Sequence, residues 1–319
     1  MIILSFNDID RLSQWKEIFP VLEAGLISLE KGHSIQPVRQ GLDIGEHGMF
    51  LSMPAVLDSE FAIVKSLATS ERYTPSIQGA CILYDLSTGA PVALLDAQSI
   101  TLWRTAAVSA IATNVLARKD AHRLGIVGTG NQAIPHISAI SQVRPLSCVS
   151  VWGRDSAKLQ TICSEIEEQF NVRVIACKTP DEVAASSDII STLTPGIEPL
   201  LMRNAVKAGT HINAVGAHAA NRSELDVELV AIARCYIDFK DAATTEAGEY
   251  VLAQEAGLIQ PDHVIGSLAE ILQKLVEGRK ADDDITLFKS LGGAIEDVSM
   301  ASYLYKKALD LKVGKVTDL

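Results

Sequence analysis

The chain has 319 residues, of which 48% are hydrophobic and 21% are charged. This composition excludes an intrinsically disordered chain and supplies enough apolar material for two globular domains. The net charge of -11, with no run of basic residues, excludes a nucleic-acid-binding surface. Residues 1–8 lack the basic start of a secretory signal, and no apolar run approaches the roughly 20 residues of a membrane span. We expect small-molecule partners, no nucleic acid, no membrane and a cytoplasmic location.

Cysteines and histidines give no sign of a metal centre. The five cysteines and seven histidines are widely spaced, and none of them shows the spacing of metal ligands. We therefore expect buried free thiols and no metal.

The first third of the chain has the pattern of an antiparallel sheet followed by a helix. Short extended runs are separated by turn residues such as Ser87-Thr88-Gly89. The expected strands are 49–53, 61–67, 79–85 and 91–95. An alanine-rich helix is then expected over 99–117, with Ser99 or Thr101 as its N-cap.

A glycine turn follows at Gly128–Ala133, directly after the apolar run Leu124–Val127. Gly128 permits a tight turn out of a strand, Gly130 lets the backbone approach a pyrophosphate, and Ala133 lets the next helix pack on the sheet. Glycine pairs with this spacing also occur in ordinary loops, so the surrounding pattern has to decide.

That pattern is an alternation of β-branched runs and helix-length segments from residue 121 to about 240. It predicts a parallel sheet with crossover helices, which makes a doubly wound Rossmann fold of the α/β class the natural assignment. The expected helices include 132–142 and 156–169, and a further helix is expected over 294–312. The expected strands are 124–127, 147–152, 172–176, 188–191, 211–215 and 235–238.

Several motifs together resemble one family, the ornithine cyclodeaminase and mu-crystallin family of nicotinamide-dependent enzymes. They run in order through nearly the whole chain, and the most specific are the Arg-Thr-Ala-Ala helix start and the Asn-Ala-Val-Gly to Glu-Leu-Asp segment. The matching pieces are 36–39, Met53-Pro54, Val64-Lys65, 88–91, 102–107, 128–133, 212–216, 224–226 and 288–292.

The resemblance implies a homodimer with two domains in each subunit. A substrate-binding and dimerisation domain of α+β type would comprise residues 1–118 with 298–319, and a Rossmann NAD(P)-binding domain would comprise 119–297. The active site would lie between the domains. The chemistry implied is hydride transfer between a nicotinamide and the carbon alpha to a carboxylate of a small amino, imino or keto acid.

Three cations in matching motifs, Arg39, Lys65 and Arg104, lie among apolar neighbours. We expect them, with Met53, to bind the substrate, because an arginine fork grips a carboxylate through two parallel bonds. The alternative is that each cation forms a structural ion pair or that Lys65 reaches solvent from an edge strand.

Asp226 and Lys65 are the expected catalytic residues. Reduction of a C=N bond needs a proton on nitrogen, and Asp226 is the carboxylate chosen as proton donor and acceptor. Asp226 could equally be the N-cap of a helix over 227–233, and Glu224 is its rival within the same motif.

The cofactor contacts follow from the same resemblance. About 20 residues past the glycine turn, where NAD-specific folds place an acid, this chain has Gly153 and Arg154, which favours NADP(H) while leaving NAD(H) possible. Asp155 could turn inward instead, and Asn213 is expected near the nicotinamide. The expected cofactor-binding residues are Thr105, Gly128, Thr129, Gly130, Asn131, Gln132, Gly153, Arg154, Thr192, Leu193, Thr194, Val215, Gly216, Ser290 and Gly292.

One departure from the family pattern bears on the substrate. Family members that cyclise ornithine carry a glutamate shortly before the Met-Pro pair, whereas this chain has Leu51 there. A second ammonium would be buried beside Leu51 without a counter-charge, so we expect a ketimine reductase of the 1-pyrroline-2-carboxylate type. The alternatives are an ornithine or lysine cyclodeaminase that recycles NAD+, and a non-catalytic NADPH or small-ligand binding protein of the crystallin type.

Overall fold

A computed structural model describes residues 1–70 and 72–318. The chain divides into two compact units, which are Met1–Arg104 with Gly292–Leu319 and Thr105–Leu291. The first boundary falls inside one continuous helix, α3 (Ala97–Leu116), rather than after it at 118/119 as the expected domain limits had it. The second falls just before α11 (Ala294–Leu311), so the whole of that helix belongs to unit 1.

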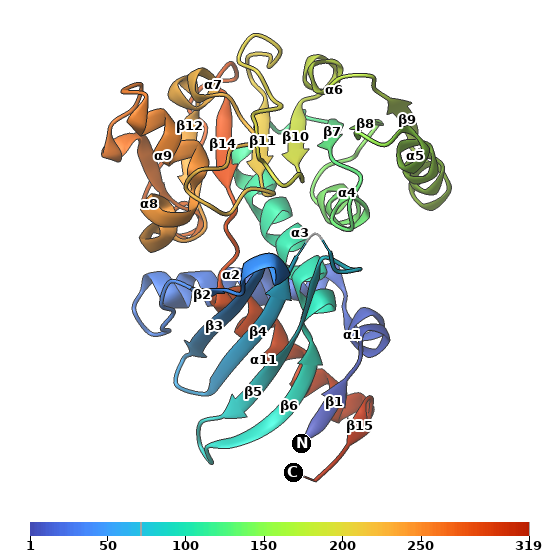
Figure 1. Ribbon diagram of the computed structural model, residues 1–319, viewed down its shortest axis with the longest axis vertical. Coiled ribbons are helices and arrows are strands. Elements are labelled where there is room, and N and C mark those ends of the chain that lie inside the picture. Colours follow the sequence, from blue (N-terminus) through green and yellow to red (C-terminus); the bar gives the residue numbers. More distant parts are fainter. Residues whose placement is uncertain (71, 319) are drawn as a thin grey trace. The chain divides into compact units, whose positions relative to one another are not determined.

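Unit 1 is a seven-stranded sheet in the order β15-β1-β6-β5-β4-β3-β2, shown in the lower part of Figure 1. All neighbouring strands are antiparallel except β1 and β6. The strands are β1 (Ile2–Leu4), β2 (Gln40–Asp43), β3 (Met49–Leu57), β4 (Phe61–Thr69), β5 (Ile77–Asp85), β6 (Ala90–Asp96) and β15 (Lys315–Val316). The four strands expected between residues 49 and 95 are therefore β3 to β6, each at least as long as expected.

Helices α1 (Phe6–Leu12), α2 (Trp15–Glu30) and α11 pack in unit 1, where α11 contacts β3, β4, β5 and α2. Alternate residues of the strands, such as Ile63, Leu83 and Leu95, are buried on this helix-covered face. A capping box between Ser5 and Asp8 begins α1. The strand-rich interpretation of this region did not include α1 and α2.

Unit 2 is an eight-stranded sheet in the order β13-β12-β14-β11-β10-β7-β8-β9, and every neighbouring pair is parallel. This is the doubly wound arrangement expected from the sequence, with β8 and β9 on one side of β7 and β10 to β13 on the other, and β14 inserted between β11 and β12 (Figure 1). The strands are β7 (Arg123–Val127), β8 (Cys148–Trp152), β9 (Arg173–Ala176), β10 (Ile189–Thr192), β11 (His211–Ala214), β12 (Arg234–Ile237), β13 (Val264–Ser267) and β14 (Thr286–Lys289).

The helices of unit 2 begin at residues that cap them. Asp155 caps α5 and Thr179 caps α6 through side-chain acceptors for first-turn backbone amides. After α3, the helices are α4 (Ala133–Ser141), α5 (Ser156–Phe170), α6 (Pro180–Ser186), α7 (Val227–Ile232), α8 (Ala243–Glu246), α9 (Gly248–Glu255) and α10 (Leu268–Leu272). Short 3-10 turns complete the chain at Gly45–His47, Lys240–Ala242 and Pro261–His263.

Two strands of unit 2 were not expected, β13 and β14. β14 lies between β11 and β12, although its residues had been interpreted only as part of a motif closing the cofactor pocket. Lys289 occupies the last position of that strand with no exposed surface. A charged residue at the end of a short run does not look like a buried strand, which is why the pattern was missed.

Within the described residues, no helix is both long and apolar enough to cross a membrane. The cysteines are all free thiols, and Cys148 at the start of β8 is the one that is half-buried rather than buried. No group of three potential metal-ligating side chains comes together in residues 1–70 and 72–318.

Candidate active site

Unit 1 brings Lys65 and Arg104 together around the first turn of α11. Lys65 Nζ lies 2.8 Å from Asp297 Oδ1, and Arg104 Nε lies 3.3 Å from that same oxygen. Arg104 Nη1 also lies 3.0 Å from Glu296 Oε2. All four side chains are almost fully buried. These ion pairs involve two acidic residues that the sequence interpretation did not single out.

Arg39 lies at the edge of this group. Its Nη2 donates to the carbonyl oxygen of Gly292 at 2.9 Å. A Cβ on Gly292, where φ is +76°, would lie 2.2 Å from Arg104 Nη1. Gly292 was expected to line the cofactor pocket, but in the structure it contacts the cations of unit 1. We call Arg39, Lys65, Arg104, Glu296 and Asp297 the cation cluster.

Strand register explains how Lys65 comes to be buried. Lys65 on β4 is paired with Met53 on β3 and with Cys81 on β5, so the three side chains lie on the helix-covered face. Lys65 Nζ donates to Thr101 Oγ1 of α3 at 2.6 Å as well as to Asp297. Burial lowers the pKa of Lys65, and the nearby Asp297 carboxylate opposes that shift.

Leu51 lies two residues before Met53 on the same strand face and is paired with Leu67. The two carboxylates near it in sequence are already engaged elsewhere. Glu46 forms an exposed ion pair with Arg72 at 3.1 Å, and Asp58 accepts from Ser28 and Ser34.

Gln36, from the same motif as Arg39, holds the start of α11 in place. Its Oε1 accepts from the backbone amide of Ile295 at 2.6 Å, where Gly293, the N-cap residue, supplies no side-chain cap. The polar side chain of Gln36 is therefore used to fix the turn that carries Glu296 and Asp297.

The glycine turn of unit 2 leaves the carboxyl end of β7, as expected. Gly128 has φ of +123°, and a Cβ there would lie 2.8 Å from the carbonyl oxygen of Leu193. Gly130 is different, because a Cβ there would meet nothing within 4 Å. A turn that tolerates only glycine at position 128 and is open at Gly130 is suited to binding phosphate groups through its backbone amides. Asn131 is exposed, and Gln132 is the N-cap residue of α4.

The residues after β8 are a glycine packed against the turn, an exposed arginine and a helix-capping aspartate. A Cβ on Gly153 would lie 2.5 Å from the Thr129 side chain, so only glycine fits against the turn. Arg154 is exposed. Asp155 Oδ1 accepts from the backbone amides of Ala157 and Lys158 at 2.9 and 3.1 Å. Asp155 therefore caps α5 rather than turning inward.

Several residues that were expected to bind the cofactor lie in the loops after β10 and β11, at the carboxyl ends of these strands. Leu193 N donates to Val127 O at 2.8 Å, and Val215 N donates to Thr192 O at 3.1 Å. Ser290 follows β14 and is buried, with its amide bonded to Ala214 O. Thr105 is buried on α3.

Asn213, which was expected to approach the nicotinamide, directs its side chain into the core of unit 2. Its side chain is fully buried and binds Thr113 Oγ1 at 3.0 Å and His211 Nε2 at 3.1 Å. Burial lowers the pKa of His211 to about 3, so the ring is neutral and belongs to a polar core. Both polar atoms of the Asn213 amide are thus occupied within the protein.

Asp226 takes the alternative role that the sequence left open. Its Oδ1 accepts from the amides of Glu228 and Leu229, and its Oδ2 accepts from the amide of Arg203 at 2.7 Å. It is the N-cap of α7. Because three backbone amides occupy both of its oxygens, we do not carry the proton-transfer role of Asp226 forward.

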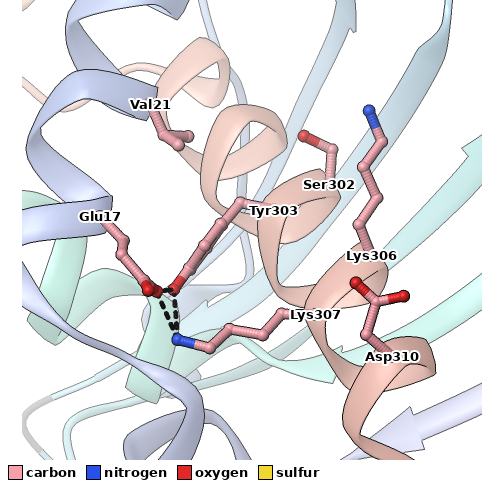
Figure 2. Close-up of a pocket in the computed structure, with 7 residues that line it drawn as sticks. All are labelled: Glu17, Val21, Ser302, Tyr303, Lys306, Lys307 and Asp310. Atoms are coloured by element: carbon pink, nitrogen blue, oxygen red, sulfur yellow. Dashed lines mark hydrogen bonds and ion pairs between the residues drawn. The ribbon is translucent and has the colours of Figure 1, made fainter.

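A surface pocket of about 450 Å³ in unit 1 contains none of these residues. It lies along α2 and α11, where Glu17 accepts from Tyr303 and Lys307, as Figure 2 shows. Its two lysines and two carboxylates balance in formal charge. It lacks the excess positive charge that would bind an acid.

Comparison with known proteins shows the family of this chain. The model of the "Ornithine cyclodeaminase/mu-crystallin family" matches residues 1–312. A Delta(1)-pyrroline-2-carboxylate reductase of Bacillus cereus is 32% identical over 99% of this chain and 99% of its own length. The ketimine reductase mu-crystallin of Rattus norvegicus is 36% identical over 93% of each chain.

Solved structures match over the full length. The Delta(1)-pyrroline-2-carboxylate reductase of Thermococcus litoralis in complex with NADH and L-proline has a TM-score of 0.96 and 32% identity, covering 99% of this chain and 100% of that one. An archaeal alanine dehydrogenase dimer with bound NAD has a TM-score of 0.93 and 29% identity, covering 100% of this chain and 99% of that one.

Proposed function

Because this chain belongs to the ornithine cyclodeaminase/mu-crystallin family, we propose that it reduces a cyclic ketimine of the 1-pyrroline-2-carboxylate type to the corresponding L-amino acid. It is an NAD(P)-dependent oxidoreductase that acts on C=N bonds of small imino acids. The observation that carries the proposal is the cation cluster of unit 1, in which Asp297 and Glu296 hold the buried cations Lys65 and Arg104.

The cluster gathers cations of the kind that bind a carboxylate. Lys65 and Arg104 are almost fully buried, and Arg39 is half-buried, with its Nη2 2.9 Å from the carbonyl oxygen of Gly292. The carboxylate of an imino acid can form charge-assisted hydrogen bonds with the arginine forks. Leu51 and Met53 on the same face suit an apolar ring.

Lys65 is the residue that we propose to deliver the proton. The nicotinamide supplies a hydride to the carbon, and the imine nitrogen needs a proton. Burial lowers the pKa of Lys65, so its ammonium gives up a proton more readily than an exposed lysine does. Asp297 and Thr101 fix the Nζ position at 2.8 and 2.6 Å.

The cyclodeaminase alternative needs a carboxylate for the second ammonium of a diamino acid. Leu51 cannot supply one, and Glu46 and Asp58 have other partners. The binding-protein alternative does not need a buried lysine with a lowered pKa. Both alternatives therefore have less support than the reductase.

For the cofactor, we propose NADP(H) in preference to NAD(H). The residue that follows Gly153 is the exposed Arg154 rather than an acid, and it can bind a 2′-phosphate, while Asp155 is directed to the backbone amides of α5. The Thermococcus relative is described with NADH, so the ratio of kcat/KM for NADPH and NADH decides the preference. Equal values would contradict it.

We also propose a homodimer formed through the sheet face of unit 1 that no helix covers. Pro54, Val64, Ile82 and Leu94 pair across four neighbouring strands in one apolar row, and each is half-exposed. The archaeal relative is described as a dimer. Light scattering should give twice the chain mass for the wild type, and Ile82→Glu should give a monomer. A monomeric wild type would contradict the proposal.

One assay separates the three functions. The purified chain is given cyclic imino acids, keto acids with ammonia, and ornithine or lysine, while NADPH absorbance and ammonia release are followed together. A reductase oxidises one NADPH for each imine consumed. A cyclodeaminase releases ammonia with no net change in absorbance. Binding of NADPH without turnover of any substrate would favour the binding protein.

A further inference from the structure

Glu224 is a fully buried carboxylate that joins two loops at the carboxyl ends of neighbouring strands. Its Oε1 accepts from the backbone amide and the hydroxyl of Thr194, at 2.7 and 2.8 Å. Its Oε2 accepts from the hydroxyl of Thr192 at 2.8 Å and from the amide of Gly216 at 2.6 Å. Thr192 ends β10, and Gly216 follows β11. One side chain therefore ties both loops together.

A second set of buried charges extends the connection to a third strand. Glu249 accepts from the amide of Glu224 at 3.2 Å and pairs with Lys289 Nζ at 3.0 Å. Lys289 ends β14 and donates to the carbonyl oxygen of Ala217 at 2.6 Å. The ends of β14, β11 and β10, which are adjacent in the sheet, are thus linked by buried polar contacts.

Stability alone does not explain this arrangement. Two buried carboxylates face one lysine, and burial raises the pKa of Glu224 while Lys289 opposes the shift. Well-packed apolar residues often stabilise a core as well as a buried ion pair does. What the carboxylate provides is four hydrogen bonds that fix two loops in one geometry.

The loops that Glu224 joins are packed against the glycine turn. A Cβ on Gly216 would lie 1.9 Å from the carbonyl oxygen of Thr194, and one on Gly128 would lie 2.8 Å from that of Leu193. The backbone of residues 193 and 194 therefore lies between two glycines with no spare room. A small displacement of this segment would close the cradle at Gly128.

We propose that Glu224 is the positioning residue of the nicotinamide cofactor site, because it holds residues 192–194 and Gly216 in the arrangement that keeps the glycine turn open. This inference rests on the proposed cofactor and names the residue that prepares its site. Glu224 acts through the loops and does not touch the reacting atoms.

Glu224→Gln tests the proposal sharply. Hydroxyl donors can rotate, but the amides of Thr194 and Gly216 cannot, and they bind different carboxylate oxygens. Whichever oxygen becomes the NH2 group of glutamine, one backbone amide then faces a donor. We expect the Kd for NADPH, measured by fluorescence, to rise at least about tenfold, which corresponds to about 1.4 kcal/mol. KM for the imino acid should change by less than about threefold.

Glu228→Gln is the matched control, because Glu228 is exposed in the first turn of α7. It should leave the NADPH Kd unchanged. Thr192→Val serves as the second variant if Glu224→Gln does not fold, since it removes one of the four hydrogen bonds while keeping the side-chain shape. It should raise the Kd by about threefold, in keeping with the loss of one ordinary hydrogen bond.

Two results would overturn the inference. One is a folded Glu224→Gln variant with a wild-type Kd for NADPH, and the other is a Thr192→Val variant with no change in Kd. In the first case, a fall in the melting temperature of Glu224→Gln, with the Kd for NADPH and the KM for the imino acid unchanged, would give Glu224 a structural role only. If the wild-type chain binds neither NADPH nor NADH, the cofactor proposal fails instead, so the two failures can be distinguished.

Discussion

Unit 1 and unit 2 hold the groups of their proposed ligand sites in place by opposite means. In unit 1 the groups are charged side chains, held by counter-charges from α11 at 2.8 to 3.3 Å. In unit 2 they are backbone segments around Gly128 and Gly216, held by the uncharged fit of glycines and by Glu224. In unit 1, one side chain can be replaced by another that fits. In unit 2, the glycines packed against a backbone segment tolerate no side chain, because any Cβ would collide with that segment.

This difference teaches which substitutions should affect chemistry and which should affect binding. Loss of a charge in the cation cluster should reduce turnover or substrate binding, whereas a change at the glycine turn should first reduce cofactor affinity.

The largest effect is expected from Lys65→Met. It removes the proposed proton donor while Arg104 still compensates Asp297 at 3.3 Å, so the fold should persist. General acid catalysis contributes about 10²- to 10⁴-fold, and we expect turnover of the imino acid to slow by about 1,000-fold. Lys306→Met, at an exposed position of α11, is the control. A loss smaller than tenfold would remove Lys65 from proton transfer.

The pH dependence of the turnover rate should also reflect the protonation of Lys65. Lys65 must be protonated to donate, and burial lowers its pKa from the ordinary value of 10.5. The rate should therefore be full at low pH and fall about tenfold per pH unit above a midpoint below 10.5.

Asp297→Asn sharpens this test, because the Asp297 carboxylate raises the pKa of Lys65 against the effect of burial. The alkaline limb should move to lower pH in that variant and stay in place in Asp310→Asn, whose side chain is exposed. If the alkaline limb does not move in Asp297→Asn, the fall in rate at high pH is not caused by deprotonation of Lys65.

The two glycines of the turn should respond differently to alanine. Gly128→Ala places a Cβ against Leu193 at φ of +123°, so we expect loss of both thermal stability and NADPH binding. The strain is about 1 to 3 kcal/mol, which corresponds to about 5- to 140-fold in affinity. Gly130→Ala meets nothing within 4 Å and should keep its melting temperature while losing affinity. Unchanged NADPH binding in Gly130→Ala would argue against close phosphate approach there.

Arg154→Gln should have a smaller and more selective effect. Removal of an exposed cation that binds a 2′-phosphate should raise KM for NADPH by about tenfold, with KM for NADH unchanged. Lys158→Gln, in the first turn of α5, which begins two residues after Arg154, is the matched control. An equal rise for both cofactors would mean that Arg154 does not read the phosphate.

Asp226→Asn should have the smallest effect on activity. Asparagine caps a helix about as well as aspartate does, so what is lost is the acceptor for the Arg203 amide, which costs about 1 kcal/mol. A modest fall in melting temperature is expected, while the turnover rate stays within about twofold of wild type. If a folded variant instead lost about two orders of magnitude in turnover, Asp226 would return to proton transfer.

The sequence predicted the sheet of unit 2 well, because short apolar runs with a glycine turn have few other interpretations. It also predicted that Lys65 and Arg104 act at the same site. In the structure, Lys65 Nζ and Arg104 Nε lie 2.8 and 3.3 Å from Asp297 Oδ1. It could not find that carboxylate. Acidic residues such as Glu296 and Asp297 are common in the first turn of any helix, and only tertiary packing shows that these two are buried.

Asp226 and Glu224 show the same limit from the other side. Both stand in one motif, and nothing in their order says which carboxylate caps a helix and which joins two loops. The answer depends on which backbone amides lie near each oxygen, and those come from residues 192–194, 203 and 216 as well as from α7. Contacts between distant parts of a chain leave no local pattern.

The free cysteines of this chain offer a way to observe unit 2 by itself. Burial raises the pKa of the Cys81 thiol to about 12, and burial also raises the pKa of Cys163 and Cys177. These thiols therefore resist alkylation. Cys148, half-buried at the start of β8, lies on the strand that ends just before Gly153 and Arg154. A dye attached there would report on that strand while the cation cluster remains unlabelled.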